Sequence, residues 1–369
     1  MSKENYRRLG DYIREVDVRN RDLEVKLSQG ISNEKYFQQP KQVAINPYND
    51  KIVRKGQFAF NRATTRNGNK ISIAYREEED CTVSASYCVF DVKNEDILSP
   101  KYLMMWFRRP EFDRYAIYHS HGSAHEYFTF ENMCDVELPI PSIEQQRKIV
   151  AEYETISRRI RLNEQMITRL EETAQTLYRK MFVDGIDKEN LSEGWRIRTL
   201  GDVAHILDYK RKPLSAEQRA LIKGKYPYFG AMSIIDYIDD YIFDGVYLLF
   251  AEDGVNVVDE DGHPNLQYVY GKFWLNNHAH IMQGNDIVST EYLYLALKES
   301  IVIHLVTGAA QPKINQENVS TIPIIVPPQI VMQQFNQKIC LIFNYKKLKE
   351  TENIELIRLQ SLLLAKMRQ

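Results

Sequence analysis

Five polar side chains crowd one short segment early in the chain, and they are Arg62, Thr65, Arg66, Asn67 and Lys70. Arginine and lysine pair with phosphates, and arginine and asparagine can each bond the edge of a base at two points. This combination is therefore suited to contacts with a nucleic acid. The same segment contains the ordinary turn sequence Arg66-Asn67-Gly68, so a solvated hairpin tip is the alternative interpretation.

A second polar segment of the same kind lies at residues 119–125, where histidine and serine alternate around a glycine. Its candidate contact residues are His121, Ser123 and His125. Small residues let a backbone approach another surface closely, which would suit a ligand-facing loop. A tight connection into the following strand explains the same composition.

The second half of the chain carries a basic triplet, Lys210, Arg211 and Lys212, immediately before a proline. A basic run is often only a solvated face, but positive clusters are few here, so we expect phosphate contacts from these side chains. Tyr228 could stack on a base, although an aromatic residue in such a run usually belongs to the core. Gln311 and Lys313 flank Pro312 in a further loop, and glutamine reads adenine while lysine reads guanine or phosphate.

Signatures of catalysis and metal binding are missing from the sequence. His278 and His280 alternate along an expected strand, but no carboxylate or cysteine lies at a suitable local spacing, so we expect polar strand residues and no metal. No P-loop or GxGxxG motif occurs. The four cysteines form no CxxC pair and sit in apolar runs, which indicates reduced, buried thiols.

Composition places the chain among water-soluble globular proteins with two domains. It has 369 residues, of which 44% are hydrophobic and 27% charged, enough for two cores plus connectors. The net charge of −2 counts against a protein that coats DNA, so any nucleic-acid surface must be local. No apolar stretch suits a membrane span or a signal peptide, and we expect a cytoplasmic location.

The chain repeats itself, and this is its strongest pattern. LGD at 9–11 recurs at 200–202, GQFAF at 56–60 is echoed by GVYLLF at 245–250, and ILSPKYL at 97–103 returns as IVSTEYL at 287–293. Gly122 and Pro141 fall on Gly308 and Pro327 at one constant offset. Two diverged copies of one plan are therefore predicted.

Each copy ends in a proline-bounded strand and a long helix, and Ser142 with Gln145 forms a capping-box pattern at the first helix start. We expect globular parts at 1–141 and 195–328, helices at 142–183 and 329–369, and a polar linker at 184–194. The first helix would be roughly 60 Å long at 1.5 Å per residue.

A heptad pattern on the first helix predicts a coiled-coil partner. Its interface positions are Ile149, Ile156, Ile160, Asn163, Ile167, Leu170 and Leu177. The second helix is less regular, but Phe335, Ile339, Ile342, Tyr345 and Leu348 begin a stripe on it, so we expect the two helices to pack together. Asn163 either fixes helix register or is a tolerated polar residue near solvent.

Several segments together resemble type I restriction-modification specificity subunits. In the second copy they are KYPYFGAMSIIDYIDDYIFDGVYLLFAEDG at 225–254, GKFWLNNHAHIM at 271–282 and TGAAQPKI at 307–314; in the first, IVRKGQFAFNRATTRNGNKISIA at 52–74 and RRPEFDRYAIYHSHGSAHEYF at 108–128. The resemblance covers nearly the whole chain. It implies two α/β (α+β) target recognition domains, duplicated with pseudo-twofold symmetry and joined by an antiparallel two-helix coiled coil.

The same resemblance implies a non-catalytic subunit that reads a bipartite, asymmetric sequence in double-stranded DNA. Its implied partners are two methyltransferase subunits, which methylate adenine at N6 with S-adenosylmethionine, and possibly restriction subunits that need ATP and Mg. Two rival hypotheses are a self-sufficient DNA methyltransferase or nuclease and a coiled-coil scaffold with no DNA role. Binding of S-adenosylmethionine by the single chain would favour the first, and assembly without a sequence-dependent DNA shift the second.

We expect Arg62→Ala or Arg66→Ala to weaken or relax recognition of one half of the target only, because each globular part would read its own half. Titrations against duplexes altered in one half at a time measure this. An equal loss of recognition in both halves would contradict the assignment of one reader to each globular part.

Overall fold

The computed structural model describes residues 6–40, 47–63, 70–120, 127–254, 257–308 and 312–367. It divides into two compact units. Unit 1 comprises Met1–Asn163 with Glu352–Gln369, and unit 2 comprises Glu164–Thr351. The two borders between the units, at residues 163/164 and 351/352, each fall inside a long helix. Each unit therefore contains a segment of both long helices. This differs from the expected division into separate heads and spacer helices.

Unit 1 is built around a four-stranded antiparallel sheet of order β2-β9-β6-β7. Its strands are β2 (Ile13–Val16), β9 (Tyr87–Val92), β6 (Phe58–Asn61) and β7 (Ile73–Tyr75). Smaller antiparallel pairs are β1 (Tyr6–Arg8) with β10 (Glu137–Pro139), β3 (Gly30–Ile31) with β4 (Phe37–Gln38), and β5 (Lys51–Val53) with β8 (Cys81–Val83). The helices are α1 (Pro100–Phe107), α2 (Pro110–Tyr118) and α3 (Phe130–Cys134).

Aromatic side chains from the sheet and the helices fill the core of unit 1. Phe58 stacks on Phe90 with ring centroids 4.9 Å apart, and Phe107 of α1 meets Phe58 edge-on at 5.9 Å. These side chains alternate along their strands, so one face of the sheet is apolar and α1 and α2 cover it. Proline begins both helices, where its missing N–H costs nothing.

Unit 2 contains a six-stranded sheet of order β12-β17-β15-β16-β13-β14. The strands are β12 (Ala204–Ile206), β17 (Ala279–Gly284), β15 (Phe243–Ala251), β16 (Leu266–Leu275), β13 (Lys223–Phe229) and β14 (Ile234–Ile238). A separate antiparallel pair joins β11 (Arg196–Thr199) to β18 (Pro323–Val326). The helices are α5 (Leu200–Val203), α6 (Ala216–Leu221), α7 (Thr290–Lys298) and α8 (Gln316–Ser320). All sheet pairs are antiparallel except β13 with β16.

The predicted duplication is confirmed element by element. In both units the first strand pairs with the strand that directly precedes a long helix. β1 pairs β10, which precedes the first long helix, and β11 pairs β18, which precedes the second. The LGD sequences form a short helical turn in each, at Leu9–Asp11 and in α5. The segments around GQFAF and GVYLLF form strands β6 and β15 at equivalent places, each paired with two neighbours.

The two long helices are α4 (Ile143–Phe182) and α9 (Gln329–Lys366), close to the predicted segments. The backbone N–H of Gln145 donates to Ser142 Oγ at 3.4 Å, as the capping pattern predicted. The expected interface positions are half-buried or buried, while charged residues cover the other faces of α4. The expected interface positions are Ile149, Ile156, Ile160, Asn163, Ile167, Leu170 and Leu177.

In unit 1, side-chain hydrogen bonds join the two helices. Asn163 Nδ2 donates to Asn353 Oδ1 at 2.9 Å, and Gln360 Nε2 donates to Ser157 Oγ at 2.6 Å. Residue numbers rise along α4 as they fall along α9, so the pair is antiparallel. Asn163 is 2% exposed, which rules out the interpretation that it lies near solvent. A buried amide pair can bond in only one alignment, as expected of a residue that sets register.

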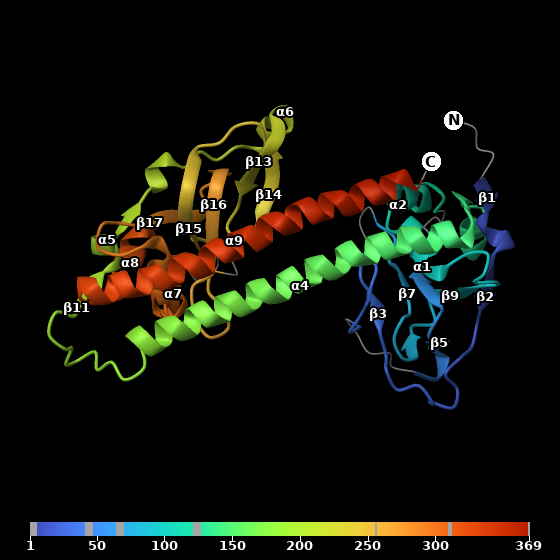
Figure 1. Cartoon of the computed structure of the whole chain (residues 1–369), viewed down its shortest axis with the longest axis horizontal. Helices are drawn as coiled ribbons and strands as arrows, with labels where there is room; N and C mark the ends of the chain where they lie inside the picture. The colour runs from blue at the N-terminus through green and yellow to red at the C-terminus, as the bar shows by residue number, and fades with distance from the viewer. Residues whose placement is uncertain are drawn as a thin grey trace. The chain divides into compact units, whose positions relative to one another are not determined.

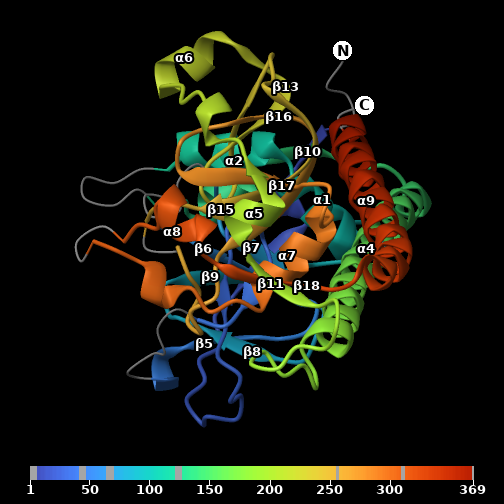
Figure 2. The ribbon, with the colours of Figure 1, turned by 90° about the vertical axis from the view of Figure 1, so that its left-hand side faces the viewer.

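In unit 2, the same helices pack antiparallel through ionic and aromatic contacts. Lys346 Nζ lies 3.1 Å from Glu171 Oε1, and Phe335 packs edge-on against Phe182 with centroids 5.0 Å apart. The ribbons of α4 and α9 lie side by side in both views (Figures 1 and 2). The stripe predicted on α9 is correct at Phe335 but wrong at Leu348, which is 64% exposed. The aliphatic stem of Lys346 covers part of the interface that the apolar pattern was expected to fill, while its ammonium group pairs with Glu171.

In the part of the chain that the structure describes, no helix is long and apolar enough to cross a bilayer. The expectation of buried thiols holds for Cys81 and Cys88 and is wrong for Cys340, which is exposed on α9. Burial raises the pKa of Cys81 to about 11, so this thiol is unreactive at neutral pH.

We expect Asn163→Ala to destabilise unit 1 by about 1–3 kcal/mol, because the buried amide of Asn353 loses its hydrogen-bonding partner. The double change Asn163→Leu with Asn353→Leu should recover most of that loss, since an apolar pair needs no such partner. Urea denaturation of the full chain measures both effects. Leu162→Ala, at a half-exposed neighbour on α4, is the control, and a single variant as stable as this control would contradict the prediction.

Candidate nucleic-acid interface

In unit 1, the start of one loop lies beside the end of another. Ala63 after β6 forms an antiparallel bridge with Tyr127, and the Phe128 N–H donates to the Arg62 carbonyl at 2.9 Å. The first polar segment singled out in the first copy therefore begins where the second one ends. The predicted contact residues Thr65, Arg66, Asn67, His121, Ser123 and His125 lie outside the described residues, which stop at 63 and 120 and resume at 70 and 127.

The two described cations of this site are exposed. Arg62 Nε donates to the Ser86 carbonyl at 3.0 Å, and Lys70 Nζ lies 2.7 Å from Glu34 Oε1. An exposed ion pair contributes only about 0–1 kcal/mol, so exchanging Glu34 for a phosphate costs little. Arg62 and Lys70 are exposed on either side of the first loop, and their contact with DNA stays a prediction.

A buried ion pair holds the far end of the first loop in unit 1. Lys35 Nζ lies 2.8 Å from Asp113 Oδ1, and these side chains are 5% and 10% exposed. Asp113 Oδ1 also accepts the backbone N–H of Ile71 at 3.1 Å, and Lys35 donates to the Phe107 carbonyl. Burial lowers the pKa of Lys35, although the charge of Asp113 opposes this. The pair fixes the point where the chain leaves Lys70 and enters the core.

Unit 2 repeats the arrangement of two adjoining loops. Asp253 after β15 forms an antiparallel bridge with Lys313, and the Ile314 N–H donates to the Glu252 carbonyl at 2.9 Å. Thr307 and Lys313 exchange two backbone hydrogen bonds of 2.8 Å, which close the second loop at its base. Gln311, predicted to read a base from this loop, lies outside the described residues, which stop at 308 and resume at 312.

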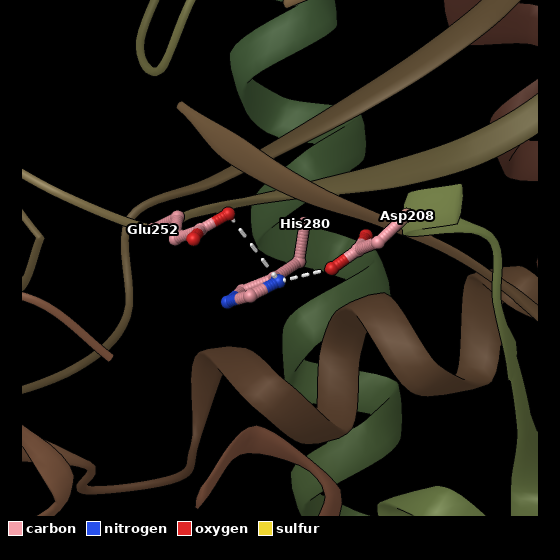
Figure 3. A group of neighbouring side chains, drawn as sticks. All are labelled: Asp208, Glu252 and His280. Atoms are coloured by element: carbon pink, nitrogen blue, oxygen red, sulfur yellow. Dashed lines mark hydrogen bonds and ion pairs between the residues drawn. The ribbon is translucent and has the colours of Figure 1, made fainter. Parts of the chain in front are cut away.

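Beneath the ends of these loops lies a buried group of charged side chains, called the ionic cluster, which comprises Asp208, Arg211, Glu252 and His280. Figure 3 shows Asp208, Glu252 and His280. His280 is 1% exposed, its Nδ1 lies 2.5 Å from Asp208 Oδ2, and its Nε2 lies 2.9 Å from the Ile314 carbonyl. With Nε2 donating to that carbonyl, Nδ1 donates to Asp208 only in the imidazolium form.

Arg211 completes the ionic cluster. Its Nη1 donates to Glu252 Oε2 at 2.5 Å and to the Ala279 carbonyl at 2.8 Å, and its Nη2 lies 3.3 Å from Asp208 Oδ2. Lys313 Nζ, at the edge of the cluster, lies 2.9 Å from Glu252 Oε1. Burial alone would raise the pKa of Glu252, but hydrogen bonds from Arg211 and Lys313 and the charge of His280 outweigh it, so the pKa is lowered.

Carboxylate and imidazole atoms of Asp208, Glu252 and His280 lie within 4.8 Å of one another, a grouping that suits a divalent metal. The residues around them do not fit one. Arg211 and Lys313 already pair with the carboxylates, and two further positive charges would repel a metal ion at this distance. The guanidinium of Arg211 takes the place that a metal would need.

Two predicted DNA contacts in unit 2 are wrong in this structure. Arg211 is directed into the ionic cluster with only 14% of its side chain exposed, because its guanidinium satisfies two buried carboxylates. Tyr228 is 1% exposed, and its hydroxyl accepts the Leu214 N–H at 2.9 Å, so the core alternative holds. Lys210 and Lys212 are exposed, and Lys313 is 49% exposed. These three lysines stay available for phosphates.

The sequence interpretation missed the ionic cluster and two exposed side chains beside it. Tyr209 is 78% exposed next to Lys210, and the exposed His278 pairs with Asp253 at 2.9 Å. Local spacing gave no sign of the cluster because Asp208 and His280 are 72 positions apart. The spacing of His278 and His280 predicted both rings on one face of a strand, but only His280 lies in β17 and is buried, whereas His278 precedes the strand and is exposed.

Two mixed α/β units with matched strand and loop pairs, each containing segments of both long helices, define a duplicated protein. The chain belongs to the family described as the type I restriction modification DNA specificity domain, whose sequence profile matches residues 10–172 and 192–357.

Relatives and solved structures agree with this family. A putative type I restriction enzyme specificity subunit of Haemophilus influenzae is 33% identical over 40% of this chain and 37% of its own length. The MjaIX specificity subunit of Methanocaldococcus jannaschii is 22% identical over 68% of this chain, and the match covers 63% of that protein. The S subunit of a type I system from M. genitalium has the same fold, with a TM-score of 0.60, 14% identity and coverage of 99% and 96%.

The lowered pKa of Glu252 predicts an acid-sensitive contribution to stability. This contribution is present above the unfolded pKa of about 4.3 and is lost as the pH falls through the folded value. Glu252→Gln should therefore unfold at a lower temperature than the wild type at pH 6, and the gap should narrow between about pH 5 and pH 3. Thermal unfolding of both proteins across that pH range measures the difference in unfolding temperature. A difference that stays constant with pH would contradict a lowered pKa of Glu252.

Proposed function

We propose that this chain is the non-catalytic DNA-reading subunit of a type I restriction-modification complex and recognises a bipartite, asymmetric target. The observation that carries the proposal is the repetition of one loop arrangement in both units. In each, a loop after a central strand adjoins a loop before a short helix, with bridges at Ala63–Tyr127 and Asp253–Lys313. A duplicated reader with unlike loops suits a target made of two unlike halves.

Side-chain chemistry at the loops supports DNA as the ligand. Exposed cations flank them in both units, with Arg62 and Lys70 in unit 1 and Lys210, Lys212 and Lys313 in unit 2. Among the described residues, no carboxylate lies within ion-pair distance of Lys210 or Lys212. Positive groups confined to the loops reconcile DNA binding with a net charge of −2, and binding should weaken steeply with added salt.

The long helices support protein partners. In unit 2, α9 leaves Leu341 71% and Leu348 64% exposed, and in unit 1 it leaves Ile354 65% and Leu362 52% exposed. Exposed apolar side chains that together form a large patch mark a surface for interaction with another protein. We propose that two methyltransferase subunits, one for each similar unit, cover them. Those subunits would use S-adenosylmethionine, and restriction subunits with ATP and Mg would add cleavage, all in the cytoplasm.

Mapping of methylated adenines across the genome, in cells with and without this chain, tests the proposal. Deletion should abolish N6-adenine methylation at one bipartite motif and leave other motifs unchanged, and a plasmid copy should restore it. Double substitution of Lys210 and Lys212 by alanine should reduce methylation at that motif, because two phosphate contacts are lost, whereas Leu221→Ala, at an exposed residue of α6, serves as the control.

Two other outcomes would overturn the proposal. If the purified chain alone transfers methyl groups or cuts DNA, it is an enzyme in its own right. If it assembles with methyltransferase subunits but the complex shifts all duplexes equally, it is a scaffold without a reading role.

A further inference from the structure

We infer that the ionic cluster of unit 2 is a positioning device for the DNA-contacting loops, and that Glu252 and His280 determine recognition of one half-target without touching DNA. This inference rests on the proposed function and names residues that act through others. It follows from what the cluster ties together, shown in Figure 3 for three of its members.

The cluster holds the segment that carries Lys210 and Lys212. Asp208 at the start of this segment accepts the Ile281 N–H at 2.9 Å, so it is bonded to β17 by backbone as well as by His280. Arg211, between the two lysines, is bonded to Glu252 and to the Ala279 carbonyl. Because Arg211 is directed inward, the lysines on either side of it are presented outward.

The cluster also holds the second loop. His280 bonds the Ile314 carbonyl, Glu252 accepts the Ile314 N–H through its own carbonyl, and the Glu252 carboxylate pairs with Lys313. Three separate contacts thus fix the point at which this loop rejoins the core. The same side chains anchor both segments, so displacement of one member moves cations on two loops.

A charged cluster is a costly way to hold a loop, since each buried charge loses hydration. Its advantage over apolar packing is that hydrogen bonds are directional. The carboxylate of Glu252 and the two ring nitrogens of His280 bond only partners at defined angles, so Arg211, Lys313 and Ile314 are held in one placement. Recognition of base edges needs that placement, because hydrogen bonds weaken steeply when misaligned.

Unit 1 provides an internal counterpart. Asp113, which is buried and paired with Lys35, accepts the Ile71 N–H next to Lys70. The two units thus anchor equivalent loops with different charged side chains. A change at Asp113 should affect the other half-target, which makes Asp113→Asn a matched control for changes in the ionic cluster.

The test uses the full chain assembled with its methyltransferase subunits and duplexes carrying the target found by methylation mapping. Fluorescence anisotropy gives Kd for the intact target and for duplexes scrambled in either half, and each ratio of Kd values measures discrimination of that half. Glu252→Gln and His280→Gln are compared with Asp113→Asn and with the wild type. Thermal unfolding of each complex accompanies the binding data.

Glu252→Gln and His280→Gln should each lower discrimination of the half-target read by unit 2 by about tenfold, which is roughly the effect of one lost base-pair contact. Discrimination of the other half-target should change by less than about twofold. Asp113→Asn should show the reverse pattern. Arg211→Lys, which keeps the charge but not the paired bonds to Glu252 and Ala279, should fall between the wild type and Arg211→Met. This graded rescue is not expected of a merely structural role.

Three results would overturn the inference. One is unchanged discrimination of both halves in Glu252→Gln and His280→Gln, even where the unfolding temperature falls. Another is an equal loss for both halves. If the wild-type complex itself discriminates neither half, the proposed function fails as well, so the wild-type measurement separates the two failures.

Discussion

Neither long helix can bury its apolar face without the other, and this constraint organises the chain. In unit 1 the pairing is polar and specific, through Asn163 with Asn353 and Ser157 with Gln360. In unit 2 it is aromatic and ionic, through Phe182 with Phe335 and Glu171 with Lys346. Each unit therefore takes helical segments from two distant parts of the chain, and its core is closed by both.

The loops that project from these units are held by charge rather than by apolar packing. Lys35 with Asp113 in unit 1 and the ionic cluster in unit 2 lie directly beneath loop ends, bonded to backbone groups. Loops must vary in sequence for a duplicated reader to recognise two unlike sequences. Anchors placed below the loops let their tips vary while their bases stay fixed. This explains how one fold carries two unlike surfaces.

Features that repeat or follow a period were predictable from the sequence. Duplication, the ends of α4 and its interface positions all follow from local patterns, because helix geometry and burial act over a few residues. The stripe on α9 was predicted only in part, since Lys346 occupies an interface position that an apolar pattern does not reveal.

The candidate site was predicted less completely, for a physical reason. Basic loop residues are visible as composition, but the direction of each side chain depends on partners far away in the sequence. Arg211 has the composition of a phosphate contact, yet Glu252 and the Ala279 carbonyl turn it inward. Tyr228 is likewise drawn into the core, where its hydroxyl meets the Leu214 N–H.

The division of the helices between the units has a consequence during synthesis on the ribosome. Met367 packs into the core of unit 1 with Val150 and Tyr153. Unit 1, although its sheet is translated first, cannot close its core until the segment around Met367 has left the exit tunnel. Unit 2 lies within one continuous stretch, Glu164–Thr351, and can complete its own packing earlier. The nascent amino-terminal half must therefore wait, incompletely covered, until that segment has been synthesised.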